Sequence, residues 1–323
     1  MATTRQGFEP LSDMQGRTLE YLRFSLTDRC NFNCIYCGTA SHHCLLSDDE
    51  VVRLATYFAH HGVTTIRLTG GESLMRFGVV DLVSRLKHAL PSTQLTLSTN
   101  GYLLAPLAAD LKDAGISGVN ISIDATSPSL FAMMSGGYDV LPVLEAIERS
   151  CSVGIPVKLN CVPLRSSYTQ QIDQLMHLAK EFDVPLRFIE LMPIGSGGFL
   201  QGVTTGEVQA YLAHQYGEET LPFAGFGRGP AVYRRYRGVS VGFISALSDC
   251  FCSRCNRLRI SASGTLFSCL CQETGLDLKA LLEKGIDDSD LWEHISGFVK
   301  HKPLSHHFDH QTIANRSLAQ LGG

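Results

Sequence analysis

The sequence predicts an α/β protein: a partial (β/α)6 TIM-type barrel, closed on its open side by a C-terminal α+β region. Strand-like and helix-like segments alternate six times, and the alternation stops near residue 195. Such alternation produces a parallel sheet with right-handed crossovers, and six units are fewer than the eight of a closed barrel. The 323 residues, 44% hydrophobic and 18% charged, have an ordinary globular balance. We expect a loose N-terminal segment (residues 1–20), a barrel (residues 21–195) and a C-terminal region (residues 196–323).

Each expected element has a local signature. The strands are short apolar runs that end in glycine or polar residues, and they are expected at residues 21–26, 63–68, 95–97, 119–123, 157–162 and 186–191. The helices are expected at residues 51–60, 79–89, 103–114, 128–134, 140–153, 170–182 and 205–216. Ser47 and Glu50 have the spacing of a capping box, which predicts where the first helix begins.

Polar residues follow five of the expected strands. They are Thr69-Gly70-Gly71-Glu72, Ser98-Thr99-Asn100, Ser122 with Asp124, Asn160, and Glu190 with Met192. Any one of these groups is compatible with ordinary turn chemistry. Because barrel enzymes carry their sites at the carboxyl ends of the strands, the recurrence of the pattern predicts a functional site at that end.

The first expected strand leads into three closely spaced cysteines. Cys30 and Cys34 have three residues between them, Cys34 and Cys37 have two, and Tyr36 precedes the last cysteine. Thiolates are the usual ligands of iron–sulfur clusters, and three cysteines on a four-iron cluster leave one iron open to a small molecule. A structural zinc site is the alternative, with a fourth ligand from His42, His43 or Cys44.

Composition narrows the class of protein. Residues 1–15 lack the apolar core of a signal peptide, and no run of about 18 apolar residues predicts a membrane span. We therefore expect a cytoplasmic protein, in which the eleven cysteines favour metal binding or catalysis over disulfides. A net charge of −4 argues against bulk nucleic-acid binding and leaves a local pocket as the place for any anion.

A second cysteine group lies in the C-terminal region. Cys252 and Cys255 are followed by Cys269, with Cys250 and Cys271 on either side, a framework that fits zinc and iron–sulfur equally well. Arg257 and Arg259 alternate on one face of an expected strand between these cysteines. Guanidinium groups suit phosphate or purine recognition, although two arginines on an exposed strand would show the same pattern.

The first cysteine motif resembles the signature of the radical S-adenosylmethionine (SAM) enzymes. Four stretches together resemble the GTP 3′,8-cyclase family, which performs the first step of molybdenum-cofactor (molybdopterin) biosynthesis. They are residues 23–37, 67–72 (Arg-Leu-Thr-Gly-Gly-Glu), 187–192 and 251–259 (Phe-Cys-Ser-Arg-Cys-Asn-Arg-Leu-Arg). The terminal Gly322-Gly323 also matches, so the resemblance covers the chain from about Tyr21 onward.

The resemblance implies a role for each matched residue. Two [4Fe–4S] clusters are implied, the first held by Cys30, Cys34 and Cys37 and the second, in the C-terminal region, by Cys252, Cys255 and Cys269. Contacts with SAM are implied for Tyr36, Gly71, Ser122 and Met192, with Glu72 facing its amino group. Contacts with GTP are implied for Arg23, Arg67, Ser98, Lys158, Arg257, Leu258 and Arg259. The residues implied in catalysis are Arg23, Glu72, Arg257 and Arg259.

The resemblance also implies a reaction and partners. A 5′-deoxyadenosyl radical would take hydrogen from C3′ of GTP, and C3′ would then bond to C8 of the guanine to give 3′,8-cyclo-7,8-dihydroguanosine 5′-triphosphate. An electron donor would reduce the clusters, a cyclic pyranopterin monophosphate synthase would act downstream, and a homodimer is possible. Such a reaction depends on holding two nucleotides near contact.

The chain departs from the family pattern at a few positions. Ser73 replaces the usual proline, Ser98 replaces a threonine, and Thr65 stands where some members carry a basic residue. Two alternatives therefore remain: a radical SAM enzyme with an auxiliary cluster that acts on another substrate such as a peptide, and an inactive iron–sulfur paralogue.

Overall fold

The computed structural model describes residues 9–38, 45–219, 229–306 and 308. A twelve-stranded sheet runs through this part of the chain in the order β12-β11-β10-β1-β2-β3-β4-β5-β6-β9-β8-β7. Its parallel strands are β1 (Tyr21–Ser25), β2 (Thr65–Thr69), β3 (Gln94–Thr99), β4 (Gly118–Ser122), β5 (Val157–Cys161), β6 (Leu186–Ile189), β9 (Val239–Ile244) and β10 (Arg257–Ile260). Antiparallel strands complete the two edges: β7 (Glu218–Glu219), β8 (Val232–Tyr236), β11 (Thr265–Phe267) and β12 (Leu276–Asp277).

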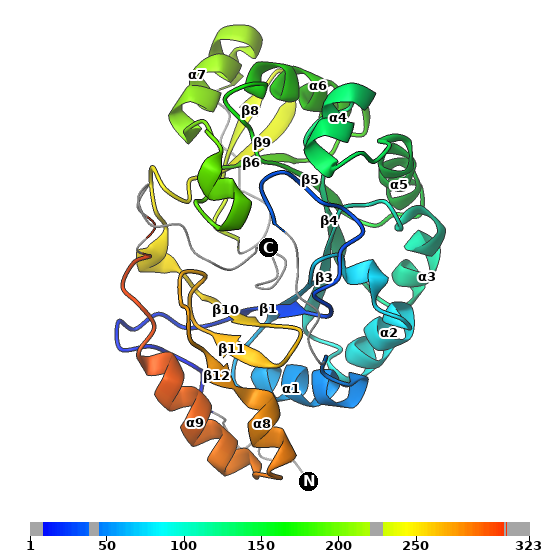
Figure 1. Cartoon of the computed structure of the whole chain (residues 1–323). Coiled ribbons are helices and arrows are strands. Elements are labelled where there is room, and N and C mark those ends of the chain that lie inside the picture. The colour runs from blue at the N-terminus through cyan, green and yellow to red at the C-terminus, as the bar shows by residue number, and fades with distance from the viewer. Residues whose placement is uncertain (1–8, 39–44, 220–228, 307, 309–323) are drawn as a thin grey trace.

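Helices cover the outer side of the curved sheet (Figure 1). They are α1 (Asp48–His60), α2 (Val79–Ala89), α3 (Ala108–Asp113), α4 (Pro128–Ser135), α5 (Leu141–Ser152), α6 (Tyr168–Glu181) and α7 (Thr205–Tyr216). Their apolar faces bury leucine and valine side chains against the strands, as Leu82 and Leu86 of α2 do. The capping box of α1 is confirmed, because the backbone N–H of Glu50 donates to Ser47 Oγ and Glu50 Oε2 accepts from Ser47 N at 2.7 Å.

The six predicted strands and seven predicted helices are present with small shifts at their ends. The segment at residues 103–114 differs most, because it begins as a 3-10 turn, η2 (Ala105–Leu107), before α3. Pro106 lies at the start of that turn, where its missing N–H costs no helical hydrogen bond. Alternation and periodicity were therefore sufficient to locate the elements of the barrel.

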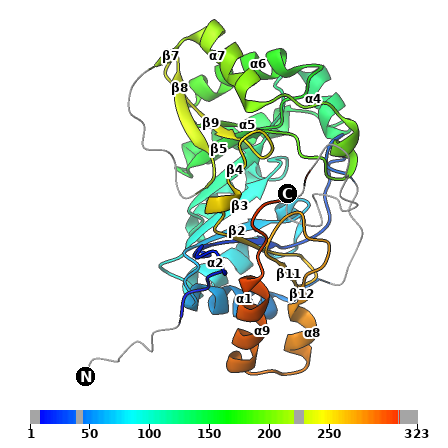
Figure 2. The same cartoon turned by 90° about the vertical axis from the view of Figure 1, so that its left-hand side faces the viewer.

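The prediction that the C-terminal region closes the barrel was wrong, because the sheet is not closed. β9 pairs in parallel with β6, and β10 pairs in parallel with β1, so the C-terminal strands extend the two edges of the sheet. Each addition satisfies the backbone groups of an edge that would otherwise be open. The C-terminal helices α8 (Leu278–Glu283) and α9 (Asp288–Lys300) lie beside α1 at the β12 end of the sheet (Figures 1 and 2).

The prediction of a loose N-terminal segment fails for residues 9–20. Leu11 and Leu19 are 1% and 0% exposed, and the backbone N–H of Leu19 donates to Leu11 O at 2.9 Å. The backbone N–H of Leu11 donates to His61 O at 3.1 Å. This segment therefore packs on the end of α1, and its Met14 N–H donates to Lys300 O of the C-terminal region at 3.2 Å.

Candidate functional site

The first cysteine group lies on the loop that follows β1. Cys30 is exposed, Cys34 and Cys37 are half-buried, and none of the three forms a disulfide. The loop is docked onto the end of α4, where the backbone N–H groups of Asn33 and Ile35 donate to Ser135 O at 3.0 Å and Met134 O at 3.1 Å. Cys30 and Cys37 both act electrostatically on Cys34, so the fixed loop keeps the three thiols near one another, which fits the donor set of an iron–sulfur cluster.

Two glycines let the turn after β2 approach this loop. The backbone N–H of Gly71 donates to Thr27 O at 2.9 Å. A Cβ atom at Gly70 would lie 2.4 Å from Thr27 O, and one at Gly71 would lie 2.3 Å from Arg29 O. Because neither position has room for a side chain, both glycines are required for this packing.

Glu72 connects the turn after β2 to the end of β3. Its buried carboxylate accepts from Leu74 N at 2.9 Å, from Thr99 Oγ1 at 2.8 Å and from Asn100 N at 2.6 Å. Burial raises the pKa of Glu72, and these donors oppose the shift. The carboxylate therefore holds the ends of β2 and β3 together, and its predicted contact with SAM stays a prediction.

Asn100 is a neighbour of the cysteine loop that was not among the predicted ligand-contacting residues. Its Nδ2 donates to Asn31 Oδ1 at 2.9 Å and lies 3.9 Å from Cys30 Sγ. Its place after β3, among the polar residues at the strand ends, was the signal that could have singled it out.

Tyr36 of the cysteine loop is hydrogen-bonded to the buried carboxyl group of Asp124, which follows β4. Its hydroxyl donates to Asp124 Oδ2 at 2.7 Å, and Asp124 Oδ1 accepts from Val162 N at 2.9 Å. Burial raises the pKa of Asp124 to about 6. A Cβ atom on Gly197 would lie 3.1 Å from Tyr36 O and 2.8 Å from Met192 O, so the backbones of two predicted SAM-contacting residues lie close together.

A row of cations crosses the inner face of the sheet. Arg23 of β1 is in register with Arg259 of β10 on one side and with Arg67 of β2 on the other. Residues paired in register point to the same face of a sheet, so the three guanidiniums are neighbours. Leu258 points to the opposite face and is fully buried in the hydrophobic core, so its side chain is not part of this row.

A second polar row lies farther round the sheet. Ser98, Asn120 and Lys158 are in register on β3, β4 and β5. Arg187 of β6 is buried, and its Nη2 donates to Asn120 Oδ1 at 2.7 Å. The inner face therefore carries six predicted GTP contacts: Arg23, Arg67, Ser98, Lys158, Arg257 and Arg259. Ser122, a predicted SAM contact, is exposed at the end of β4.

The charges in these rows act against one another. Burial lowers the pKa of Arg23 well below its usual value, and Arg259 and Arg67 lower it further. Burial also lowers the pKa of Arg259 to about 10, with a further contribution from Arg257. Burial lowers the pKa of Lys158 to about 8, assisted by Arg187 and Arg67. Buried and half-buried like charges that destabilise one another are stabilised by a polyanion, which indicates a site for phosphate groups.

The second cysteine group lies at the other end of the same strands. Cys252 belongs to the 3-10 turn η4 (Cys252–Arg254), Cys255 ends this turn before β10 begins, and Cys269 follows β11. β10 runs parallel to β1, and the backbone N–H of Tyr21, where β1 begins, donates to Asn256 O at 3.2 Å. The Cys30 loop follows the end of β1, so the cationic row lies between the two cysteine groups.

The local charges favour ionisation of Cys269. Its pKa is lowered to about 5 by the thiol of Cys271, which donates across 3.3 Å, and by Lys302 and Arg259, against the effect of burial. Burial acts to raise the pKa of Cys255, but Arg257 and Lys302 bring it below the usual value. Thiolates are the metal-binding form of cysteine, so Cys255 and Cys269 suit a metal centre, whereas burial raises the pKa of Cys252.

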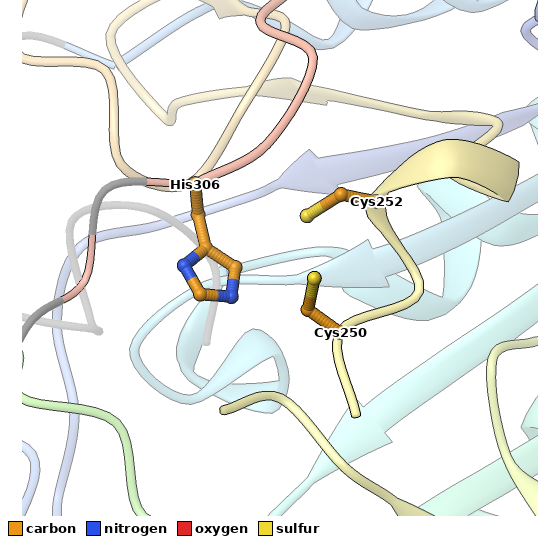
Figure 3. Close-up of side chains that lie close together, drawn as sticks. All are labelled: Cys250, Cys252 and His306. Carbon is orange, nitrogen blue, oxygen red and sulfur yellow. The ribbon is translucent and has the colours of Figure 1, made fainter. Parts of the chain in front are cut away.

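Cys252 also forms a cluster with Cys250 and His306 (Figure 3). Their ligand atoms lie within 4.8 Å of one another, as expected of a site for a single ion. However, His306 Nε2 is 2.7 Å from Ala246 O, and His306 Nδ1 accepts from Phe308 N at 3.3 Å. Both ring nitrogens are thus engaged by the protein, which favours packing over metal coordination.

Some predicted features lie outside this site or outside the described residues. Two arginines of the basic run at residues 233–237 form surface ion pairs, Arg234 with Glu218 at 2.6 Å and Arg235 with Glu219 at 3.6 Å, whereas Tyr236 of the same run is buried. Sequence reasoning missed two buried cations near the second cysteine group, Arg17 and Lys302, because their partners are distant in the chain. Gly322-Gly323 and the alternative zinc ligands His42, His43 and Cys44 fall in the parts that the structure does not describe.

The chain is similar to known proteins along almost its whole length. The radical SAM superfamily model matches residues 24–179, and the model named Molybdenum Cofactor Synthesis C matches residues 184–308. A GTP 3′,8-cyclase of Clostridium perfringens (strain 13 / Type A) is 37% identical, with 97% of this chain and 100% of the relative covered. A GTP 3′,8-cyclase of Rhodopseudomonas palustris (strain ATCC BAA-98 / CGA009) is 38% identical, with coverage of 93% and 90%.

Solved structures support the fold alone. Streptococcus suis SuiB bound to its precursor peptide aligns with a TM-score of 0.65 at 14% identity, covering 91% of this chain and 67% of that chain. No helix in the described part of the chain has the length and hydropathy that a membrane span requires. With two relatives above 35% identity over nearly complete lengths and a superfamily model matched over the first cysteine group, the chain belongs to the GTP 3′,8-cyclase family of radical SAM enzymes.

Proposed function

We propose that this protein converts GTP to 3′,8-cyclo-7,8-dihydroguanosine 5′-triphosphate, the first step of molybdenum-cofactor biosynthesis. The observation that carries the proposal is the row Arg259–Arg23–Arg67, which lies between the Cys30–Cys37 loop and the second cysteine group. A strand rises about 3.3 Å per residue, so four steps along β1 separate its ends by roughly 13 Å. A nucleotide triphosphate held on the row would therefore face one cysteine group on each side.

Membership in the radical SAM superfamily implies SAM and an iron–sulfur cluster, and the residues present fit them. Cys30, Cys34 and Cys37 would hold this cluster, which with SAM supplies the hydrogen-abstracting radical. Tyr36, Gly71, Ser122 and Met192 are the proposed contacts for SAM. The hydrogen bonds of Glu72 and Asn100 keep the surrounding turns in one arrangement, so that the bound groups meet in a fixed geometry.

We further propose that Cys252, Cys255 and Cys269 hold a second [4Fe–4S] cluster whose open iron binds the guanine. Cys269 rather than Cys271 is proposed as the third ligand because the family resemblance implies it, and Lys302 Nζ donates to the carbonyl of Ser268, the residue directly before Cys269. Arg257 and Arg259 belong to β10, which begins two residues after Cys255, so they would lie between the cluster and the phosphates. Arg23, Arg67, Lys158 and Ser98 would hold the triphosphate.

Catalysis would depend on the positioning of the two nucleotides and on the neutralisation of the phosphate charge. The cations offset the phosphate charge, and the rigid inner face of the sheet would hold C3′ of the ribose toward SAM. An electron donor must reduce the clusters, and the product would pass to a cyclic pyranopterin monophosphate synthase. A cytoplasmic location and a homodimer are also proposed.

The test is anaerobic GTP turnover with reductant and SAM. We expect about eight irons per chain, the total for two four-iron clusters, and a cyclised GTP product. Cys269→Ala should still cleave SAM but lose cyclisation, while Cys151→Ala, a half-buried thiol outside both groups, should behave as wild type. Full cyclisation by Cys269→Ala would refute the second-cluster assignment. Full iron without GTP turnover would favour a different substrate such as a peptide, or an inactive paralogue.

A further inference from the structure

We propose that Lys302, fixed by Arg17, is a positioning residue of the second iron–sulfur site: its buried ammonium joins the ligand-bearing segments and favours the reduced cluster. This inference rests on the proposed second cluster. It concerns two residues that lie outside every motif of the sequence analysis. Arg17 comes from the N-terminal segment, and Lys302 comes from the segment after α9.

Lys302 connects the strands next to two proposed ligands. Its side chain is buried, with the residue 3% exposed, and Nζ donates to Arg257 O at 2.9 Å and also to Ser268 O. Arg257 follows Cys255 by two positions, and Ser268 directly precedes Cys269. One ammonium group therefore fixes the backbone beside both cysteines.

Arg17 connects the remaining ligand to Lys302. It is 8% exposed, and its Nη1 donates to Cys252 O at 2.6 Å. Its Nη2 donates to Lys302 O at 3.3 Å and to Pro303 O at 2.8 Å. Asp13 aligns the guanidinium through an ion pair of 2.6 Å. Together, the two cations link the backbones at all three proposed ligands through a few direct hydrogen bonds.

The charge of Lys302 has a consequence beyond geometry. A cluster held by three thiolates carries negative charge, and burying that charge is costly without a nearby cation. Lys302 Nζ donates to the carbonyls of Arg257 and Ser268, so its charge lies close to Cys255 and Cys269. A cation beside a cluster stabilises the form that carries one more electron, because reduction adds negative charge.

The experiment isolates the second site in the full-length chain. Cys30→Ala, Cys34→Ala and Cys37→Ala together remove the first set of ligands, and the protein is reconstituted anaerobically with iron and sulfide. Lys302→Met, Lys302→Arg and the control Lys300→Met are compared in this background by iron content and a redox titration followed by electron paramagnetic resonance. Lys300 is exposed at the end of α9, so its replacement removes the same charge away from the site.

We expect about four irons per chain in the background protein. At a fixed potential, Lys302→Met should lower the ratio of reduced to oxidised cluster about tenfold, which is about 59 mV for a one-electron couple. Lys302→Arg and Lys300→Met should leave the ratio unchanged. Loss of iron from Lys302→Met with retention in Lys302→Arg would also support the inference.

The outcomes separate this inference from the function on which it rests. A background protein that binds no iron would refute the second cluster itself. A Lys302→Met protein that keeps its iron and titrates like Lys300→Met would refute the role of the Lys302 charge. Loss of iron from both Lys302→Met and Lys302→Arg would also overturn it, because the retained cation would then have no effect.

Discussion

Ser73 shows how a departure from the family pattern is accommodated by its neighbours. Its buried hydroxyl donates to Ser98 O at 2.8 Å, so it ties the turn after β2 to the end of β3. The residue begins the 3-10 turn η1 (Ser73–Met75), and the first position of a helical turn tolerates proline. Serine thus replaces the rigidity of a proline ring with a specific hydrogen bond.

Substitutions at Ser73 should separate these two sources of stability. Ser73→Ala should reduce the free energy of unfolding by about 1 kcal/mol, because the Ser98 carbonyl loses a buried partner. Ser73→Pro should cost less, since the lower entropy of the unfolded chain returns about 0.4–1 kcal/mol. Urea denaturation measures both changes. A Ser73→Pro protein less stable than Ser73→Ala would show that the turn cannot accept the ring.

Turns and helix ends position the cysteine loop more than the strands do. The loop rests on the end of α4 and on the glycine turn after β2, and neither contact involves a cysteine. Gly71 is decisive because its own packing against Arg29 O leaves no space for a methyl group. A residue predicted to contact SAM thus also has a structural role in the free protein.

Gly71→Ala should displace the cysteine loop. We expect loss of the first site's iron, about four of eight per chain, with the second site retained. Gly297→Ala is the matched control, because Gly297 lies within α9 and a Cβ there meets nothing within 4 Å. That change should stabilise the helix by roughly 1 kcal/mol. Unchanged iron in Gly71→Ala would show that the loop can shift without losing its cluster.

Elements were predictable from the sequence where periodicity was strong, and their long-range partners were not. The Ser47 capping box and the strand carrying Arg257 and Arg259 are local patterns, and both are confirmed. The pairing of β10 with β1 joins residues more than two hundred positions apart, so no local signal indicates it. Arg17 and Lys302 were missed for the same reason, because the Arg17 guanidinium bonds to residues 235 and 285 positions away and Lys302 Nζ to carbonyls 45 and 34 positions away.

At the scale of the whole molecule, the sheet brings together cations from distant parts of the chain. The C-terminal strands extend both edges of the sheet, and β10 adds Arg259 beside Arg23 and Arg67 of the N-terminal half. Gathering these cations on one buried face costs stability in the absence of an anion. The fold therefore holds a charge arrangement that a bound polyanion would relieve.

This trade between stability and binding predicts the behaviour of Arg23→Met. Because Arg23 lies between Arg259 and Arg67, its removal should leave the melting temperature of the ligand-free protein unchanged or higher. Tripolyphosphate is the probe, and at one hundred times its Kd it should stabilise the wild type by about 2.7 kcal/mol. Arg23→Met should lose most of this gain at the same concentration.

Arg235→Met is the matched control, because Arg235 pairs with Glu219 on the surface edge of the sheet. It should keep the full response to tripolyphosphate, and added sodium chloride should weaken that response in both proteins by screening. Thermal melts with and without the probe give all of these values. A ligand-free Arg23→Met protein that melts well below wild type would mean that the guanidinium stabilises the fold. The cationic row would then be part of the core rather than a charge held ready for a phosphate ligand.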